Sequence, residues 1–236
     1  TTQYLINLFI AGLLFWVSIT LLLPTLPTYI QSMGGTTQQV GIVMSCFAIG
    51  LLGSRTWLGN LADQRSRKLV ILIGTIVAAL APLGYLLVNS IAGLAQIRAF
   101  HGISIAAFTI GYSALVVDLA PREQRGTLIG YMNLAVPIGM SIGPAFGGFL
   151  QSSDNLLLPN HTGYEILFMI SGICVALAFF LASQIKPTSQ PEINRSPESD
   201  TEVIQRELWQ LSRDPALIVP TIKLLLIGIV FCTLVD

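Results

Sequence analysis

The residue with the most unusual chemistry in this sequence is Arg98, which lies inside a long apolar run. It follows Ile91 by two helical turns, so a helix over this run would carry the guanidinium well inside a membrane span. An arginine at the centre of a membrane helix costs about 2.5–3.5 kcal/mol on insertion scales. We therefore expect Arg98 to face protein or a water-filled cavity; the alternative is an arginine that snorkels or forms a structural pair.

Three further polar residues, His101, Thr109 and Tyr112, follow Arg98 on roughly the same helical face. A neutral histidine can titrate near physiological pH, so His101 is a candidate for handling protons. A hydrogen-bonded packing histidine is the alternative. Arg98, His101, Thr109 and Tyr112 are thus our candidates for proton coupling and for lining a cavity.

A charged turn, residues 59–68, separates two apolar runs and holds Asp63 together with Arg65, Arg67 and Lys68. Short charged turns of this kind connect membrane helices, and their bases fix which side of the bilayer they face. Asp118 ends the run that contains Arg98 and is expected at the same level. An ion pair between Asp118 and this turn is therefore geometrically reasonable.

Glycine and proline recur in the run 127–150. The residues that form this pattern are Gly130, Gly139, Gly143, Pro144, Gly147 and Gly148. Gly139, Gly143 and Gly147 are four apart and form one smooth stripe, which lets helix backbones approach closely. Pro137 and Pro144 cannot donate to the preceding turn and permit a bend. Generic tight packing is the alternative interpretation.

The elements that must position these residues are membrane helices. Apolar residues make up 53% of the 236 residues and charged residues only 10%, whereas soluble domains carry about 25% charged residues. Six segments have the roughly 20 residues that a spanning helix needs. They are 5–30, 40–61, 69–88, 91–120, 127–150 and 166–185. The net charge is zero, which gives no case for nucleic acid. We also find no phosphate-binding loop and no cluster with metal-ligand spacing, so we expect no cofactor and no metal.

The bases alternate along the loops, which predicts the topology. Lys and Arg occur in 62–68, 121–126 and 186–213, and are absent from 29–39, 89–90 and 151–165. By the positive-inside rule the first set is cytoplasmic, and so is the N-terminus. We expect a six-helix bundle over 1–185, a linker with a short amphipathic helix over 186–213, and the beginning of a seventh span over 214–236.

Together these residues resemble the major facilitator superfamily (MFS) of secondary transporters. Gly59, Leu61, Ala62, Asp63, Arg67 and Lys68 match the family's signature loop between helices 2 and 3, although Gln64 and Ser66 depart from it. Arg98 with Gly102 resembles the helix-4 motif, whose arginine is implicated in proton coupling. The glycines and Pro144 of 130–148 match the helix-5 motif associated with antiporters. Pro24 and Pro27 match a feature of drug and sugar efflux members.

The resemblance implies an all-α membrane protein with two six-helix bundles, each made of two inverted three-helix repeats. This chain would supply the N-terminal bundle and part of helix 7. A second bundle, on the same or a separate chain, would be its partner. Asp63 would contact helix 11 of that bundle, and Asp63, Arg67 and Asp118 would act as a cytoplasmic latch. The stripe Gly139–Gly147 would let helix 5 slide and seal against a helix of the other bundle.

We therefore expect a proton-coupled efflux antiporter of a small solute or drug, not an enzyme, in the cytoplasmic membrane. Its partners would be the lipid bilayer, the solute, protons and the second bundle. No Asp or Glu lies near mid-membrane in the first six spans, and Asp236 is the one visible acidic candidate. A uniporter of the same fold, or an MFS-like accessory membrane protein that transports nothing, are the alternatives.

Overall fold

A computed structural model describes residues 2–152 and 163–185, which all belong to the same unit of the chain. The helices are α1 (Thr2–Ser32), α2 (Thr37–Gln64), α3 (Arg67–Leu87), α4 (Ile91–Leu119), α5 (Arg125–Asn133), α6 (Ala135–Ser152) and α7 (Gly163–Ser183), with a 3-10 turn η1 (Arg122–Gln124) before α5. Within the described residues, six spans are long and apolar enough to cross a membrane, and α5 and α6 together form the fifth. The linker and seventh span predicted over 186–236 lie outside these residues.

Polar caps fix where the spans begin. The Thr36 side chain accepts from the Gln39 backbone N–H at 3.3 Å, and the Gln39 side chain accepts from the Thr36 N–H at 2.8 Å. This reciprocal capping box satisfies two of the N–H groups that a helix start leaves free. Ser90 caps α4 with one hydrogen bond, accepting from the Gly93 N–H at 3.2 Å. Ser66, where the family pattern has a glycine, caps α3 by accepting from the Leu69 N–H.

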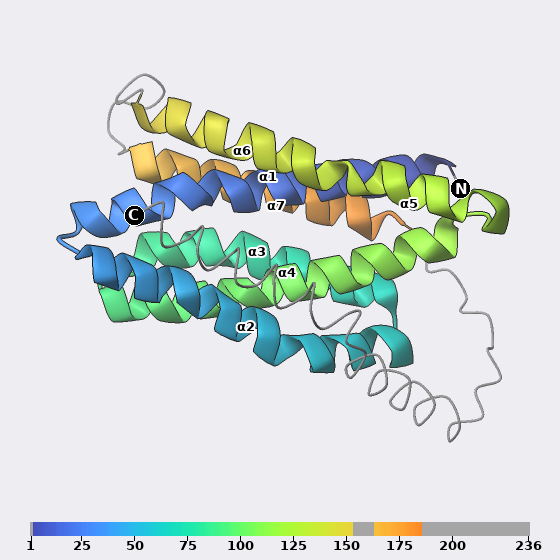
Figure 1. The fold of residues 1–236 in the computed structure, drawn as a ribbon, viewed down its shortest axis with the longest axis horizontal. Coiled ribbons are helices and arrows are strands. Elements are labelled where there is room, and N and C mark those ends of the chain that lie inside the picture. Colours follow the sequence, from blue (N-terminus) through green and yellow to red (C-terminus); the bar gives the residue numbers. More distant parts are fainter. Residues whose placement is uncertain (1, 153–162, 186–236) are drawn as a thin grey trace, which may run out of the picture. The chain divides into compact units, whose positions relative to one another are not determined.

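The helices pack as two related sets of three. Helix α1 packs mainly on α6 and α7, helix α4 packs mainly on α2 and α3, and α3 and α7 pack on each other. In Figure 1, α1, α6 and α7 lie along one side of the bundle and α2, α3 and α4 along the other. Exchanging α1 with α4, α2 with α5–α6, and α3 with α7 returns the same set of interfaces. The two repeats are therefore α1–α3 and α4–α7. Since each span reverses direction, α4 runs opposite to α1, so these repeats are inverted.

Glycines make the close approaches at both of these related crossings, α6 on α1 and α2 on α4. A Cβ added to Gly139 on α6 would lie 3.0 Å from the backbone nitrogen of Val17 on α1. A Cβ added to Gly50 on α2 would lie 3.3 Å from the backbone nitrogen of Ile103 on α4. Small residues at such crossings allow backbone contact in membranes, where the hydrophobic effect does not drive helices together.

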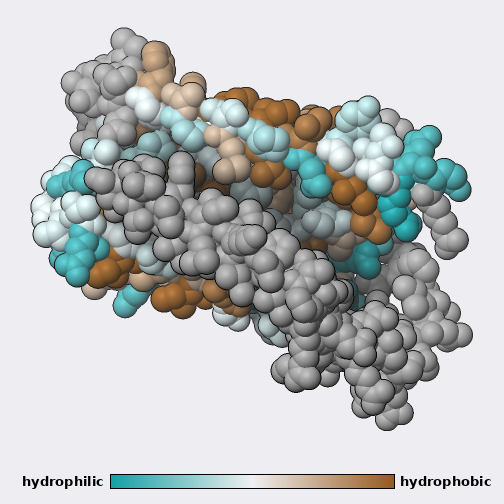
Figure 2. Space-filling view, viewed as in Figure 1, coloured by the Kyte–Doolittle hydropathy of each residue, from teal (hydrophilic) through white to brown (hydrophobic). Residues whose placement is uncertain are grey.

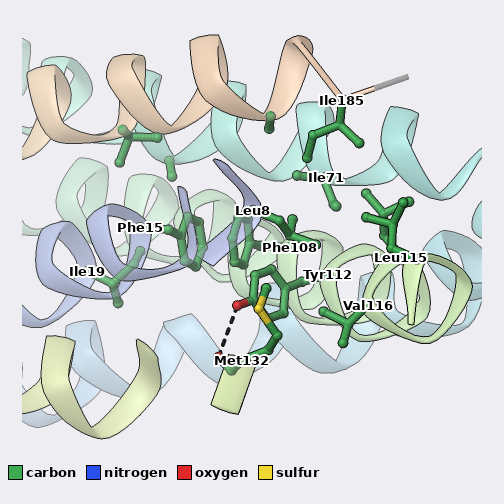
Figure 3. Close-up of a cluster of buried hydrophobic side chains, with 14 residues drawn as sticks. Leu8, Phe15, Ile19, Ile71, Phe108, Tyr112, Leu115, Val116, Met132 and Ile185 are labelled. Carbon is green, nitrogen blue, oxygen red and sulfur yellow. Dashed lines mark hydrogen bonds between the residues drawn. The ribbon is translucent and has the colours of Figure 1, made fainter. Parts of the chain in front are cut away.

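Apolar side chains fill the interior and also cover the outside. The rings of Phe15 on α1 and Phe108 on α4 stack at 3.8 Å between centroids and join the two repeats in a buried cluster (Figure 3). Leu52, Trp57, Phe149 and other large apolar residues are exposed. Figure 2 shows hydrophobic residues along the length of the bundle and hydrophilic ones gathered toward its two ends. That distribution suits a bundle surrounded by lipid.

Candidate transport site

Arg98 lies in the protein interior. Its side chain is 3% exposed, and its Cζ atom is 4.4 Å from the centroid of the Phe47 ring on α2. The close crossing of α2 and α4 makes this contact possible, because a Cβ on Gly102 would lie 2.9 Å from the Leu51 backbone nitrogen. A guanidinium over an aromatic face gains a cation–π interaction of about 0.5–2 kcal/mol. Arg98 therefore faces protein, as expected, and not lipid.

His101 lies beside Arg98 and has a partner from a third helix. The hydroxyl of Tyr85 on α3 is 3.1 Å from the His101 Nδ1 atom, and both side chains are fully buried. The Phe47 and His101 rings meet edge-on, with centroids 5.8 Å apart. We did not predict Tyr85 as a site residue. The only signal in the sequence is a single tyrosine within the apolar segment 69–88.

Polar atoms of this cluster lack partners. Arg98 Nε, Arg98 Nη1 and His101 Nε2 are buried without a hydrogen bond. In the part of the chain that the structure describes, the single ion pair joins Arg67 to Asp118, so no carboxylate there neutralises Arg98. An unpaired buried charge is costly. Arg98 therefore has hydrogen-bonding capacity for a group that the described residues do not supply.

Thr109 and Tyr112 do not join this cluster, although they were expected on the same face. The Thr109 hydroxyl donates to the Ile105 carbonyl of its own helix at 2.7 Å. The Tyr112 hydroxyl donates to the Met132 carbonyl at the end of α5 at 3.0 Å (Figure 3). Eleven residues of helix separate His101 from Tyr112, which corresponds to a rise of about 16 Å. A shared face does not bring residues together over that distance.

The charged turn is bound to the bundle by two of its bases. Arg67 forms an ion pair with Asp118 through Nη1, which also donates to the Ala114 carbonyl at 3.0 Å. The predicted ion pair between Asp118 and this turn is therefore present. Lys68 Nζ donates to the Ser183 carbonyl at the end of α7, at 2.6 Å. The turn thus connects the ends of α4 and α7.

Two residues of the loop motif point away from the bundle. Asp63 is exposed, and a Cβ added to Gly59 would meet no atom within 4 Å. The described residues therefore contain no contact that explains either position. Asp236, the acidic candidate of the seventh span, lies outside the described residues.

The stripe of three glycines on α6 packs against α1 of the same bundle. A Cβ on Gly143 would lie 2.8 Å from the Leu21 backbone nitrogen, and one on Gly147 would lie 2.8 Å from the Leu21 oxygen. The Thr20 hydroxyl donates across the crossing to the Gly139 carbonyl at 2.8 Å. The expectation that this stripe faces a helix of another bundle is therefore wrong. Helical spacing identifies a face but not the helix opposite it.

The other positions of this motif are more open. Cβ atoms added to Gly130 and Gly148 would meet no described atom within 4 Å. Pro144 is half-buried on α6. Among the residues described, no group of three or more His, Cys, Asp and Glu side chains could hold a metal ion.

Six apolar spans in inverted repeats, with charge at the ends and one buried arginine inside, form the half-unit of a secondary transporter. The chain belongs to the Major Facilitator Superfamily, whose model matches residues 8–235. It is therefore a multi-pass membrane protein of a transporter family and not an enzyme.

Similar proteins support this assignment. The chain is 27% identical over 169 residues to the quinolone resistance protein NorA of Staphylococcus aureus, covering 72% of this chain and 41% of NorA. It is 29% identical over 136 residues to an uncharacterised MFS-type transporter of Methanocaldococcus jannaschii, covering 58% of this chain and 35% of that protein. The chain thus spans less than half the length of these relatives.

Solved transporter structures share the fold. A bacterial homologue of the human lysosomal transporter Spinster, in an inward-facing and unoccupied conformation, aligns with a TM-score of 0.73 at 17% identity, over 90% of this chain and 48% of that one. A D-xylose–proton symporter aligns with a TM-score of 0.65 at 17% identity, over 97% and 56%. The described bundle therefore has the fold of about half of an MFS transporter.

Proposed function

We propose that the complete protein is a proton-coupled antiporter that exports a small solute or drug by alternating access. The observation that carries this proposal is the buried Arg98 next to His101, with no carboxylate among the described residues to neutralise it. A cation held in this way responds to any change of charge nearby, because electrostatic interactions are strong where water is excluded. Similarity to a quinolone resistance protein favours drugs as the exported class.

The cytoplasmic end of the bundle acts as the latch in this proposal. Arg67 and Asp118 hold the charged turn against α4, while the exposed Asp63 is free to contact the second bundle. The latch would stabilise the outward-facing state and open when the bundles rock. Coupling follows because proton and solute favour different states of the same two-state machine.

In the fifth span, we assign different roles to the two kinds of glycine. Gly139, Gly143 and Gly147 hold α6 against α1 and keep this half of the bundle rigid. Gly130 and Gly148, whose added Cβ atoms would meet no atom of the described residues within 4 Å, are the positions where a helix of the second bundle can approach. The solute would bind between the bundles, near mid-membrane.

The test is transport by the complete protein in lipid vesicles with an imposed pH gradient. Solute-dependent proton movement is expected for the wild type. Flux without proton movement would identify a uniporter, and no flux across a broad solute panel would favour an accessory membrane protein. Arg98→Ala is expected to abolish coupled transport while the protein is still expressed.

We also propose that the protein lies in the cytoplasmic membrane with the charged turn and residues 186–213 on the cytoplasmic side. Arg65 is exposed in that turn, so a cysteine at this position can report its side. In a variant with Cys46, Cys174 and Cys232 replaced, Arg65→Cys should react with a membrane-impermeant maleimide only after the cells are permeabilised. Labelling in intact cells would contradict this orientation.

A further inference from the structure

Tyr85 connects the two buried polar residues of the candidate site. Its hydroxyl is 3.1 Å from His101 Nδ1, and the positive charge of Arg98 is near enough to act on the same hydroxyl. Tyr85 comes from α3, whereas Arg98 and His101 come from α4, so the contact crosses a helix interface. The Tyr85 ring also packs against Phe168 on α7 at 5.5 Å between centroids.

The chemistry of the three groups favours one direction for their hydrogen bonds. A guanidinium has donors only, so Arg98 can pair with the hydroxyl only by donating to its oxygen, which leaves the hydroxyl hydrogen of Tyr85 available to His101 Nδ1. If Nδ1 instead carried the proton and donated to the Tyr85 oxygen, both the hydroxyl hydrogen and the Nε2 lone pair would be buried without partners. If Nδ1 accepts, only the Nε2–H is unpaired among the described residues. The arrangement therefore favours the Nε2–H tautomer of His101.

The surroundings of His101 favour this neutral form. The charged and titratable groups that face it, within the described residues, are Arg98 from α4 itself and Tyr85 from α3. Helix α2 presents the Phe47 ring, and α7 presents Phe168 behind Tyr85. An imidazolium here would be a second buried cation beside the guanidinium, without a carboxylate between them. Like charges repel strongly in such a site.

We propose that Tyr85 is a positioning residue for proton coupling, because its hydroxyl holds His101 as the neutral Nε2–H imidazole and occupies the atom that a proton must reach. The proposal rests on the proposed antiport. A proton from the aqueous phase adds to the Nδ1 lone pair only when the hydrogen bond from Tyr85 breaks, and Tyr85 keeps its own proton. The resulting imidazolium repels Arg98 and favours the transporter state in which these groups are further apart.

The first experiment measures the tautomer directly. In the complete transporter with every histidine except His101 replaced, nitrogen-15 NMR of the labelled imidazole distinguishes a protonated from an unprotonated Nδ1. We expect an unprotonated Nδ1 and a protonated Nε2 at pH 7 in the state that the structure describes. A protonated Nδ1 would overturn the proposal, and this test needs no substitution of Tyr85.

The second experiment compares Tyr85→Phe with a matched control, Tyr29→Phe, in pH-gradient transport. The Tyr29 ring also packs on Phe168, with 5.4 Å between the ring centroids. His101 is not among the ring or hydrogen-bond partners of Tyr29 in the described residues. Tyr85→Phe should move the pH midpoint of transport upward by roughly half to one pH unit, the size expected for losing one hydrogen bond to the neutral ring. Tyr29→Phe should leave the midpoint unchanged.

The two readouts separate this proposal from the proposed function. If the wild type shows no proton-driven flux, the antiport and the coupling role both fail, whatever tautomer the NMR spectrum shows. If the wild type is coupled but Tyr85→Phe keeps both the wild-type tautomer and the wild-type pH midpoint, Tyr85 is only a packing residue. A merely structural role would lower the amount of folded transporter without moving the midpoint.

Discussion

The hydroxyl of Tyr112 on α4 donates to the backbone carbonyl of Met132, at the point where the fifth span is interrupted (Figure 3). Helix α5 ends at Asn133 and α6 begins at Ala135. Pro137 cannot donate to the Asn133 carbonyl, so the helical ladder is broken here. Tyr112 satisfies a carbonyl beside this break from a neighbouring helix. This is how membrane helices tolerate proline, because freed backbone groups find partners in adjacent spans.

Replacing Tyr112 with Phe should therefore destabilise the bundle. The substitution keeps the ring, which stacks on Phe108 at 5.3 Å, and removes the side-chain donor to the Met132 carbonyl, which also accepts from the Leu134 N–H. We expect a loss of about 0.5–1.5 kcal/mol, the net contribution of one hydrogen bond. Thermal unfolding in detergent measures it, with Tyr131→Phe as the control, since Tyr131 is 63% exposed. Equal unfolding temperatures for the two variants would contradict the role of this hydrogen bond.

The second prediction is that a methyl group added where α6 crosses α1 destabilises the bundle. Gly143→Ala would place Cβ 2.8 Å from the Leu21 backbone nitrogen, and backbone atoms cannot give way easily. We expect a loss of about 1–3 kcal/mol, as for overpacking of a tight core. Gly148→Ala is the matched control on the same helix, since its Cβ would meet no atom within 4 Å. Comparable destabilisation by both variants would contradict the role of the crossing, because Gly→Ala by itself favours a helix.

The third prediction is that the ion pair between Arg67 and Asp118 stabilises the bundle. Asp118→Asn removes the charge that pairs with the partly buried Arg67, and we expect a loss of about 1–3 kcal/mol, as for a hydrogen bond between charged groups. Exchanging the two residues, as Arg67→Asp with Asp118→Arg, should recover part of that loss. Unfolding measurements on the single and double variants give the coupling between the two sites.

Asp63→Asn provides the comparison within the same motif. Asp63 is exposed and makes no ion pair in the described ranges, so its replacement should leave the unfolding temperature of this bundle unchanged. Transport by the complete protein should nevertheless fall if Asp63 contacts the second bundle. Normal transport by this variant would remove Asp63 from the latch.

Much of the fold could be predicted because lipid imposes simple rules on the sequence. Apolar length gave the six spans, and the observed ends lie within three residues of the predicted ones. At the start of α2 the helix extends to a polar cap, Thr36, which apolar length does not reveal. The buried position of Arg98 followed from the cost of placing a guanidinium in lipid. The pair of Arg67 and Asp118 followed from the expected level of both residues.

The partners of individual side chains could not be predicted, because periodicity does not say which helix lies opposite a face. The stripe at Gly139 was assigned to a second bundle, yet it contacts α1. Tyr112 was grouped with Arg98, yet it contacts the end of α5. Tyr85 was overlooked, because one tyrosine in an apolar span has no periodic signal. Each of these contacts depends on how the two repeats interlock.

The contact between α1 and α7 leads to the last prediction. The hydroxyls of Ser18 and Ser171 are 2.7 Å apart, and Ser18 also lies 3.0 Å from the Ser171 carbonyl. Both residues are buried, at 1% and 0% exposure. Hydrogen bonds between membrane helices contribute about 0.6 kcal/mol on average, and up to about 1.7 kcal/mol.

Ser18→Ala or Ser171→Ala alone should cost somewhat more than that average, because each leaves the other hydroxyl buried with fewer partners. The double variant should cost less than the sum, since both hydroxyls are then gone. Additive losses in thermal unfolding would show that the two serines act independently.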